Sequence, residues 1–198
     1  MDELSVNTTV AYGDESIRMA GNPPFYMLGV CLLEDADAID FGRLVKLMPP
    51  GSRKLHWRDM SQGLQRESLK LLTDIKRADV VVVASPLDGK KQERARRKCL
   101  EALLPKLEAK GIGEFVLESR GATSDKLDVS YIKYAKGSKL VKSISIAHAD
   151  GANEPRLWVA DQVIGAMGDY MTQTSNWKHW KSEWEALSPN IKQIDVTL

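Results

Sequence analysis

The sequence predicts an α/β fold built around one mixed sheet, and three observations support this prediction. Three β-prone runs come first in the chain, at 8–13, 25–33 and 54–57. The run at 25–33 is almost entirely apolar, as expected of a central strand. From residue 80 onward, strand patterns alternate with helix patterns. Together these features are typical of a mixed sheet with helices on both faces.

Local signals place the helices between these strands. Pro49, Pro50 and Gly51 end a helix expected over 35–48, and Asp59 or Ser61 can cap the next one. Gly111 ends a long helix, and Pro155 begins another. The predicted helices are 35–48, 61–77, 90–110, 125–136, 155–171 and 176–186, and the later strands are 80–84, 114–118 and 141–147.

Length and composition favour one domain, 1–174, with a Trp-rich helix and tail, 175–198, packed on it. No apolar run approaches the roughly 20 residues of a membrane span, and the first residues lack the pattern of a secretory signal. We therefore expect a cytoplasmic protein without a membrane partner. Cys31 and Cys99 are interpreted as reduced packing residues, because no Cys-x-x-Cys pair is present.

Three carboxylates are the strongest candidates for chemistry. Asp14 follows Val10 and Tyr12 on one face of the first strand, just where that strand is expected to end, although a turn aspartate explains it equally well. Asp161 lies on an apolar helix face, as a site residue or as a buried structural aspartate. Glu118 ends a strand, where α/β sheets usually bind ligands, or it pairs with Arg120. Mg²⁺ or Mn²⁺ suits such carboxylates.

Further polar residues are second-rank candidates. His56 with Asp59, and His148 with Asp150, are each close enough in sequence for the carboxylate to orient the imidazole, although a lone histidine near a strand end is more often structural. The glycines Gly165 and Gly168 favour close approach of their helix to a sheet or loop. The second-rank candidates are Glu15, His56, Asp59, Asp88, His148 and Asp150.

Two further patterns indicate partners. Between positions 90 and 98 six basic residues stand against one acid, which predicts a patch that attracts phosphate backbones, unless it is only a solvated helix face. They are Lys90, Lys91, Arg94, Arg96, Arg97 and Lys98. Trp177, Trp180 and Trp184 form a stripe that would close the domain or make a homodimer contact, with base stacking as a weaker option.

Four short pieces, in this order, resemble the bacterial domain-of-unknown-function family 3800, which is regarded as ribonuclease H-like: AYGDES, KLHWRD, VLESRG and LWVADQVIGA. The resemblance implies a ribonuclease H-like mixed sheet with helices on both faces and a C-terminal helical extension. It also implies two divalent ions held by Asp14, Asp161 and a third carboxylate. Glu118 stands where an aspartate is commoner in that family. The strand next to the first often supplies the second metal ligand in this fold, so Asp88, which follows the valine strand, competes with Glu118 for the third role.

The resemblance therefore implies a metal-dependent nuclease that hydrolyses phosphodiester bonds of DNA or RNA. The first ion would activate water, and the second would stabilise the leaving oxygen. A non-catalytic nucleic-acid-binding module and a protein-interaction module on the same fold are the alternatives. The net charge of +1 gives no reason to favour or exclude a nucleic-acid partner.

Overall fold

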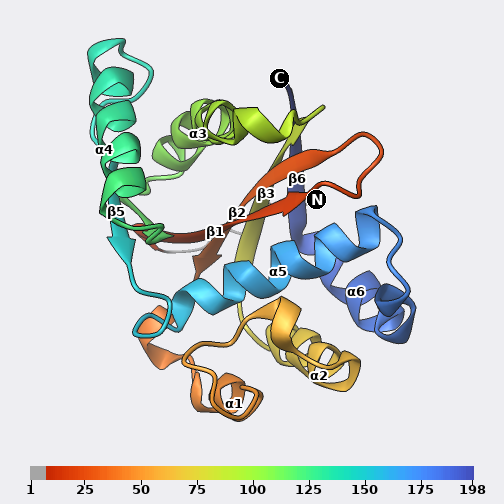
Figure 1. The fold of residues 1–198 in the computed structure, drawn as a ribbon. Coiled ribbons are helices and arrows are strands. Elements are labelled where there is room, and N and C mark those ends of the chain that lie inside the picture. The colour runs from red at the N-terminus through yellow and green to blue at the C-terminus, as the bar shows by residue number, and fades with distance from the viewer. Residues whose placement is uncertain (1–7) are drawn as a thin grey trace.

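A six-stranded mixed sheet, in the order β5-β4-β1-β2-β3-β6, organises the computed structural model, which describes residues 8–198 (Figure 1). Antiparallel pairs join β1 to β2 and β2 to β3, while β4 lies parallel to β1, β5 to β4, and β6 to β3. The predicted α/β class with a mixed sheet is confirmed. The strands are β1 (Val10–Arg18), β2 (Phe25–Leu33), β3 (Arg77–Ser85), β4 (Glu114–Glu118), β5 (Ser145–Ala149) and β6 (Ile191–Thr197).

Helices cover both faces of the sheet, and each face has its own apolar core. The helices α3 and α4 lie on one face, and α1, α2, α5 and α6 lie on the other (Figure 1). All nine residues of β2 are buried, because this strand is covered on both faces. The helices are α1 (Gly42–Val45), α2 (Gln62–Thr73), α3 (Gln92–Ala109), α4 (Ala122–Gly137), α5 (Arg156–Met171) and α6 (Lys181–Leu187).

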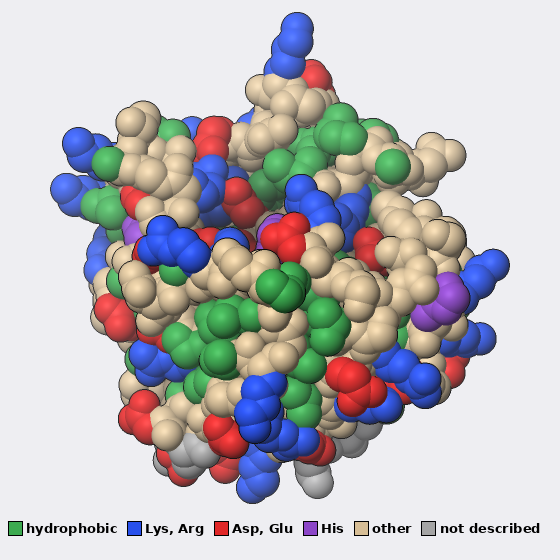
Figure 2. Space-filling model, turned by 60° about the horizontal axis from the view of Figure 1, so that its bottom comes forward, with side chains coloured by type: hydrophobic (Ala, Val, Ile, Leu, Met, Phe, Trp, Pro, Cys, Tyr) green, Lys and Arg blue, Asp and Glu red, His purple; other side chains and the backbone are tan. Residues whose placement is uncertain are grey.

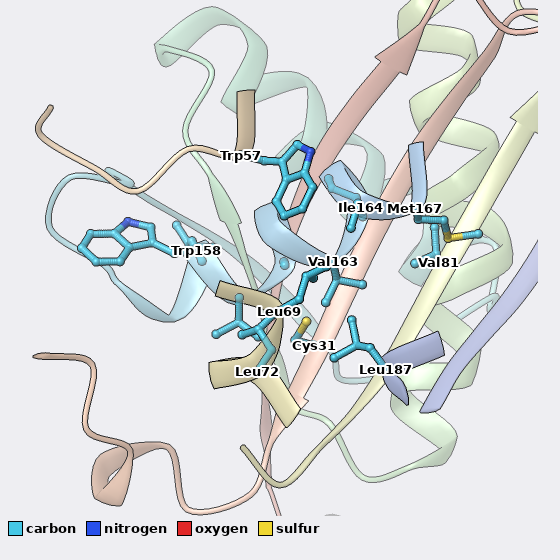
Figure 3. Close-up of a cluster of buried hydrophobic side chains, with 14 of the residues drawn as sticks. Cys31, Trp57, Leu69, Leu72, Val81, Trp158, Val163, Ile164, Met167 and Leu187 are labelled. Atoms are coloured by element: carbon cyan, nitrogen blue, oxygen red, sulfur yellow. The ribbon is translucent and has the colours of Figure 1, made fainter. Parts of the chain in front are cut away.

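Helix α5 lies unusually close to the sheet, and it forms the centre of the core that Figure 3 shows. A Cβ atom on Gly29 of β2 would overlap Cγ2 of Ile164 in α5, so only glycine permits this approach. A Cβ on Gly165 would likewise overlap the indole of Trp57. The predicted close approach at Gly165 is therefore confirmed. It matters for function because α5 carries Asp161.

We expect Gly29→Ala to lower the free energy of unfolding by about 1–3 kcal/mol, the usual cost of overpacking a core. The added methyl must displace Ile164, and α5 moves with it. Chemical denaturation measures the effect. Gly63→Ala is the matched control, since a Cβ at Gly63 meets no atom within 4 Å and removes a flexible residue from α2. Equal stabilities of the two variants would contradict this packing account.

The second half of the chain matches the predicted elements better than the first. The strand expected at 54–57 is wrong, because these residues form an irregular segment that leads into a 3₁₀ turn at 57–59. The strand β1 continues to Arg18, so Asp14 lies in its middle and neither ends the strand nor belongs to a turn. The strand β5 begins four residues later than expected.

The C-terminal segment belongs to the sheet. Within the predicted tail, β6 pairs along the length of β3, which the sequence analysis did not foresee. The expected domain 1–174 therefore lacks an edge strand, and its first seven residues lie outside the described part of the chain. Among residues 8–198, no helix combines the length and apolar character needed to cross a bilayer.

The tryptophans of this segment close the core instead of forming an outer stripe. A 3₁₀ helix at 176–179 precedes α6, in place of one continuous helix. Trp180 is fully buried and packs edge-on against Trp57 at 5.2 Å between ring centroids, and Trp184 is also buried. Trp177, half-buried, packs edge-on against Tyr170. The predicted homodimer contact is therefore wrong for Trp180 and Trp184, because neither ring is accessible to a second chain.

Candidate active site

The strand β1 directs neighbouring acidic residues to opposite faces of the sheet. Tyr12 packs in the core beneath α5, and Asp14 follows it on the same face because side chains alternate along a strand. Glu15 points to the face covered by α3 and α4, where it pairs with Arg96. Asp14 thus reaches the α5 face from the middle of β1. Among residues 8–198, its one hydrogen bond is accepted by Oδ1 from the backbone N–H of Glu15 at 2.7 Å.

The other two candidate carboxylates lie beside Asp14 on this face. Glu118 ends β4 directly next to the middle of β1, since Gly13 pairs with Leu117 in the parallel register. Asp161 lies on α5, the helix that packs on this face of the sheet. Both negative charges raise the pKa of Asp14. Asp88 follows β3, which β2 separates from β1 and β4. The structure therefore brings together three residues that are far apart in the sequence, and it favours Glu118 over Asp88 as the third member.

Asp161 is held firmly in place by its neighbours. Its Oδ2 accepts hydrogen bonds from the backbone N–H of Trp57 at 2.7 Å and from Nε2 of Gln162 at 2.9 Å, and its Oδ1 lies 2.8 Å from Nδ1 of His56. The hydrogen bond with Asp161 raises the pKa of His56, although burial opposes the shift. Asp161 thus anchors the loop at 54–57, as the structural interpretation of this residue expects, and it also faces the candidate site.

Lys54 supplies the positive charge among these carboxylates. Its ammonium donates a hydrogen bond to Oε1 of Glu118. Burial by itself would lower the pKa of Lys54, but this hydrogen bond and the charges of Glu118, Asp14 and Asp161 outweigh burial and raise it. The Lys54 ammonium therefore lies where a cation is attracted by all three carboxylates. Glu118 pairs with Lys54, and not with Arg120 as one interpretation of the sequence proposed.

Asp14 is the carboxylate whose charge is least balanced. Burial raises the pKa of its carboxyl group well above the usual range, and the negative charges of Asp161 and Glu118 raise it further. The hydrogen bond from Glu15 and the charge of Lys54 oppose this effect without cancelling it. Within residues 8–198, Asp14 has no ion-pair partner. A half-buried carboxylate beside two like charges favours a proton or a cation.

The donor chemistry suits a hard divalent cation, although no complete cage is present. Among the described residues, no three His, Cys, Asp or Glu side chains are arranged closely enough to hold a metal ion together. Mg²⁺ does not require such a cage, because one or two carboxylates with waters and substrate phosphates are sufficient. Asp14 and Glu118 on adjacent strands meet that requirement. Asp14 and Glu118 are therefore the residues that would hold a divalent cation, and Glu118 is paired with Lys54 in this structure.

A small hollow of about 20 Å³ adjoins Asp161, which is room for about one water molecule. His56, Arg18 and Arg58 contribute polar groups to its wall, and Glu15 lies at its border.

On the face that Figure 2 shows, acidic and basic side chains lie next to one another, and neither sign of charge dominates. Any attraction for an anion therefore depends on local basic groups and not on the field of the whole face.

His148 and Glu15 belong to a second polar cluster, on the opposite face of the sheet. Arg96 makes two hydrogen bonds of 2.8 Å to the carboxylate of Asp128, and it also pairs with Glu15. His148 lies 2.9 Å from the same Asp128 through Nε2. The predicted pairing of His148 with Asp150 is therefore wrong. Asp150 instead accepts a hydrogen bond from the backbone N–H of Ala152 in the turn after β5.

Two further second-rank residues, Asp59 and Asp88, lie outside the carboxylate cluster. Asp59 is exposed in the 3₁₀ turn, so the predicted orientation of His56 by Asp59 is wrong, and Asp161 takes that role. Asp88 is exposed and caps the turn before α3 by accepting a hydrogen bond from the backbone N–H of Lys90. Asp88 follows β3, which lies on one side of β2, whereas β1 and β4 lie on the other side. The strand β2 therefore separates Asp88 from the site.

The basic run is only partly a surface patch. Arg96 is 2% exposed and is bound to Asp128, so its predicted contact with nucleic acid is wrong. Lys90 and Lys91 are the first residues of the run and lie in a 3₁₀ turn, and Lys91 pairs with Asp88. The basic residues of this run that remain accessible are Lys90, Lys91, Arg94, Arg97 and, half-buried, Lys98.

From the sequence, Lys54 is not identified as a site residue, and Arg96 is assigned to the wrong role. The available signal was the spacing of Lys54 and His56 in KLHWRD. In an extended segment, side chains that are two residues apart point to the same side. Lys54 reaches Glu118 and His56 reaches Asp161 from that side. For Arg96, the signal was its position beside Ala95 and three residues before Cys99, on the apolar side of α3.

Comparison with known proteins adds no relative. No family model matches the chain, and no curated protein matches it in sequence. The resemblance of the four short motifs thus remains a prediction.

Proposed function

We propose that this chain is a metal-dependent nuclease that hydrolyses phosphodiester bonds of DNA or RNA at the site formed by Asp14, Glu118 and Asp161. One observation carries the proposal. Three carboxylates from β1, β4 and α5 meet on one face of the sheet around a single ammonium group, and Asp14 among them lacks a compensating partner within residues 8–198. An apolar core gains nothing from such an arrangement, whereas a cation site requires it.

The topology supports a ribonuclease H-like assignment for this proposal. The strands β1, β2 and β3 pair antiparallel in chain order, and β4 and β5 then add parallel beside β1 with helices between them. A mixed sheet with helices on both faces is what the resemblance to family 3800 implies, although the third strand is 77–85 and not 54–57. Cys31 and Cys99 are buried free thiols, which is compatible with the proposed cytoplasmic location.

A divalent cation held by Asp14 and Glu118 would stabilise negative charge on a phosphodiester and favour attack by water. The residues of the chain supply the rest. Asp161 fixes His56 through Nδ1, so Nε2 of His56 is left to exchange a proton with water or with a leaving group. Lys54 and Arg58 add positive charge beside the site, which would attract the phosphate of the phosphodiester substrate. Asp161 contributes through position and charge, since both of its oxygens already accept hydrogen bonds.

The direct test uses the purified full chain with labelled single-stranded and double-stranded DNA and RNA, each in Mg²⁺, Mn²⁺ or EDTA. We expect cleavage of at least one substrate in the presence of a divalent cation and none in EDTA. Gel analysis of the products measures the result. An absence of metal-dependent cleavage on all four substrates would contradict the proposal.

Lys54→Met gives an independent prediction about the cation. Removing the ammonium leaves Glu118 without its partner, so the free energy of unfolding in EDTA should fall by about 1–2 kcal/mol. Mn²⁺ should bind the variant more tightly than the wild type and restore its stability, because ligand binding to the folded state stabilises it. Calorimetric titration with Mn²⁺ and thermal unfolding measure both effects. Lys46→Met, at an exposed position, is the control. Equal Mn²⁺ affinity in all three proteins would argue against a cation at this site.

A non-catalytic nucleic-acid-binding module is the second candidate. The observation in its favour is that Asp161 and Glu118 are both engaged in the described structure, by the loop at 54–57 and by Lys54. A binding module would keep its affinity for nucleic acid in EDTA and would never cut it. The cleavage assay separates these two functions.

A further inference from the structure

A groove lies between α3 and α4, on the face of the sheet opposite the carboxylates. Two adjoining cavities, of about 380 Å³ and about 820 Å³, share Glu93, Arg97, Tyr131 and Tyr134 in their walls. The smaller one ends at Arg96 and Asp128, and the larger one continues to Lys139 after the end of α4. The groove is therefore an extended channel along two helices and not a closed pocket for a small molecule.

The charges along the groove leave an excess of free cations. Each acidic residue of its walls is already paired: Asp128 with Arg96, Glu101 with Lys98 at 2.9 Å, and Glu93 with Arg120. Three basic residues of the walls have no ion pair within residues 8–198. They are Arg94, Arg97 and Lys139. An anionic chain is thus the ligand that this groove can neutralise.

Aromatic rings face the same channel. Tyr134 is 66% exposed, which is unusual for a large ring, and Tyr131 lies beside it with 6.2 Å between ring centroids. Burial raises the pKa of Tyr131 to about 12, so its ring stays neutral in the physiological range. Leu127, half-exposed, extends the apolar surface toward Arg96. Exposed aromatic faces between cationic side chains are the features by which proteins bind unpaired bases and their phosphates.

We propose that the α3–α4 groove binds single-stranded nucleic acid, with bases stacked on Tyr134 and phosphates held by Arg94, Arg97 and Lys139. A duplex hides the faces of its bases, so it cannot use Tyr134 in this way. The inference rests on the proposed nuclease function and names its substrate class. The groove and the candidate site lie on opposite faces of β1, where Glu15 pairs with Arg96 at the end of the groove and Asp14 lies on the carboxylate face.

The test measures fluorescence anisotropy of labelled oligothymidylate and oligouridylate, each of about a dozen nucleotides, in EDTA so that no strand is cut. We expect Tyr134→Ala to weaken binding about tenfold, while Tyr134→Phe binds like the wild type because it keeps the ring. Lys139→Gln should weaken binding and reduce the slope of log affinity against log salt by about 0.7, the value for one lost phosphate contact on a single strand. Comparison of the two oligonucleotides distinguishes DNA from RNA as the source of the strand.

Lys133→Gln is the matched control, since Lys133 is exposed on α4 but does not line the groove. All the substituted side chains except Lys139 lie on regular helices, and thermal unfolding verifies that each variant is folded. If Tyr134→Ala and Lys139→Gln bind as Lys133→Gln does, the groove proposal is overturned even when the wild type cuts nucleic acid. If binding depends on Tyr134 and Lys139 but no substrate is ever cut, the groove is supported and the nuclease proposal fails.

Discussion

Asp14→Asn is expected to abolish metal-dependent cleavage while raising the free energy of unfolding at pH 7 by about 0.5–2 kcal/mol, the range of a favourable single substitution. Asparagine keeps the oxygen that accepts the hydrogen bond from the backbone of Glu15, but it removes the charge that would offset a divalent cation. In the absence of metal, that charge is repelled by Asp161 and Glu118 and is poorly solvated. Neutralising it relieves both penalties.

The stability gain should depend on pH in a defined direction. The folded state raises the pKa of Asp14, so it binds a proton more tightly than the unfolded chain does. The wild type is therefore stabilised by Asp14 below the unfolded pKa of about 3.9, and it loses this contribution as the pH rises through the folded value. The advantage of Asp14→Asn over the wild type should be small near pH 4 and larger near pH 7.

Thermal unfolding in EDTA across this pH range, together with the cleavage assay, measures both effects. Asp59→Asn is the control, because Asp59 is an exposed carboxylate outside the cluster, and it should change neither quantity. If Asp14→Asn lowers the melting temperature while the protein cuts nucleic acid as before, Asp14 is structural and the active-site proposal is wrong.

Arg96→Met should have the largest effect on stability, a loss of about 3–5 kcal/mol. Burial would lower the pKa of Arg96, but its hydrogen bonds to Asp128 and the charge of Glu15 outweigh burial and raise it. Methionine fills much of the same volume but leaves Asp128, which is 2% exposed, with only Arg120 at 3.6 Å as a permanently charged partner, beside His148 at 2.9 Å. A buried carboxylate that loses its bidentate partner is costly, and we expect that cost to destabilise the packing of α4 against α3.

Urea denaturation of Arg96→Met and of Arg94→Met makes this test quantitative. Arg94 lies on the same helix but is exposed and has no ion pair in the described region, so its replacement should change stability by less than about 0.5 kcal/mol. Adding Asp128→Asn to Arg96→Met should recover part of the lost free energy of unfolding, because it removes the buried negative charge that Arg96 no longer balances. A double variant less stable than Arg96→Met would show that the cost has another origin.

Periodicity predicted the buried elements well, because burial on both faces leaves a strong pattern. The strand at 114–118 and the helix over 155–171 agree with β4 and α5 almost residue for residue. The strand β6 escaped prediction because it lies at the edge of the sheet, where its residues are exposed or half-buried and carry no continuous apolar run. The segment at 54–57 resembles a strand locally, yet Asp161 holds it as a loop by binding the backbone of Trp57.

The grouping of Asp14, Glu118 and Asp161 was predictable because each lies on a recognisable element with a defined face. Their partners were not, since Lys54 and His56 reach the site from an irregular loop whose course depends on α5. Arg96 was misassigned for a related reason. A run of basic residues on a helix must turn some of them inward, and only the position of Asp128 on α4 decides which one is buried.

The pairing of β6 with β3 has a consequence for synthesis of the chain on the ribosome. β3 is complete at residue 85, but its partner begins only at residue 191. The strand β3 contains four consecutive valines. At a translation rate of about 5–20 residues per second, its outer edge remains unpaired for roughly 5–20 seconds before β6 is synthesised. An open apolar strand edge is a template for pairing with another chain. The nascent protein is therefore most prone to aggregation during this interval, when a chaperone that shields β3 would help most.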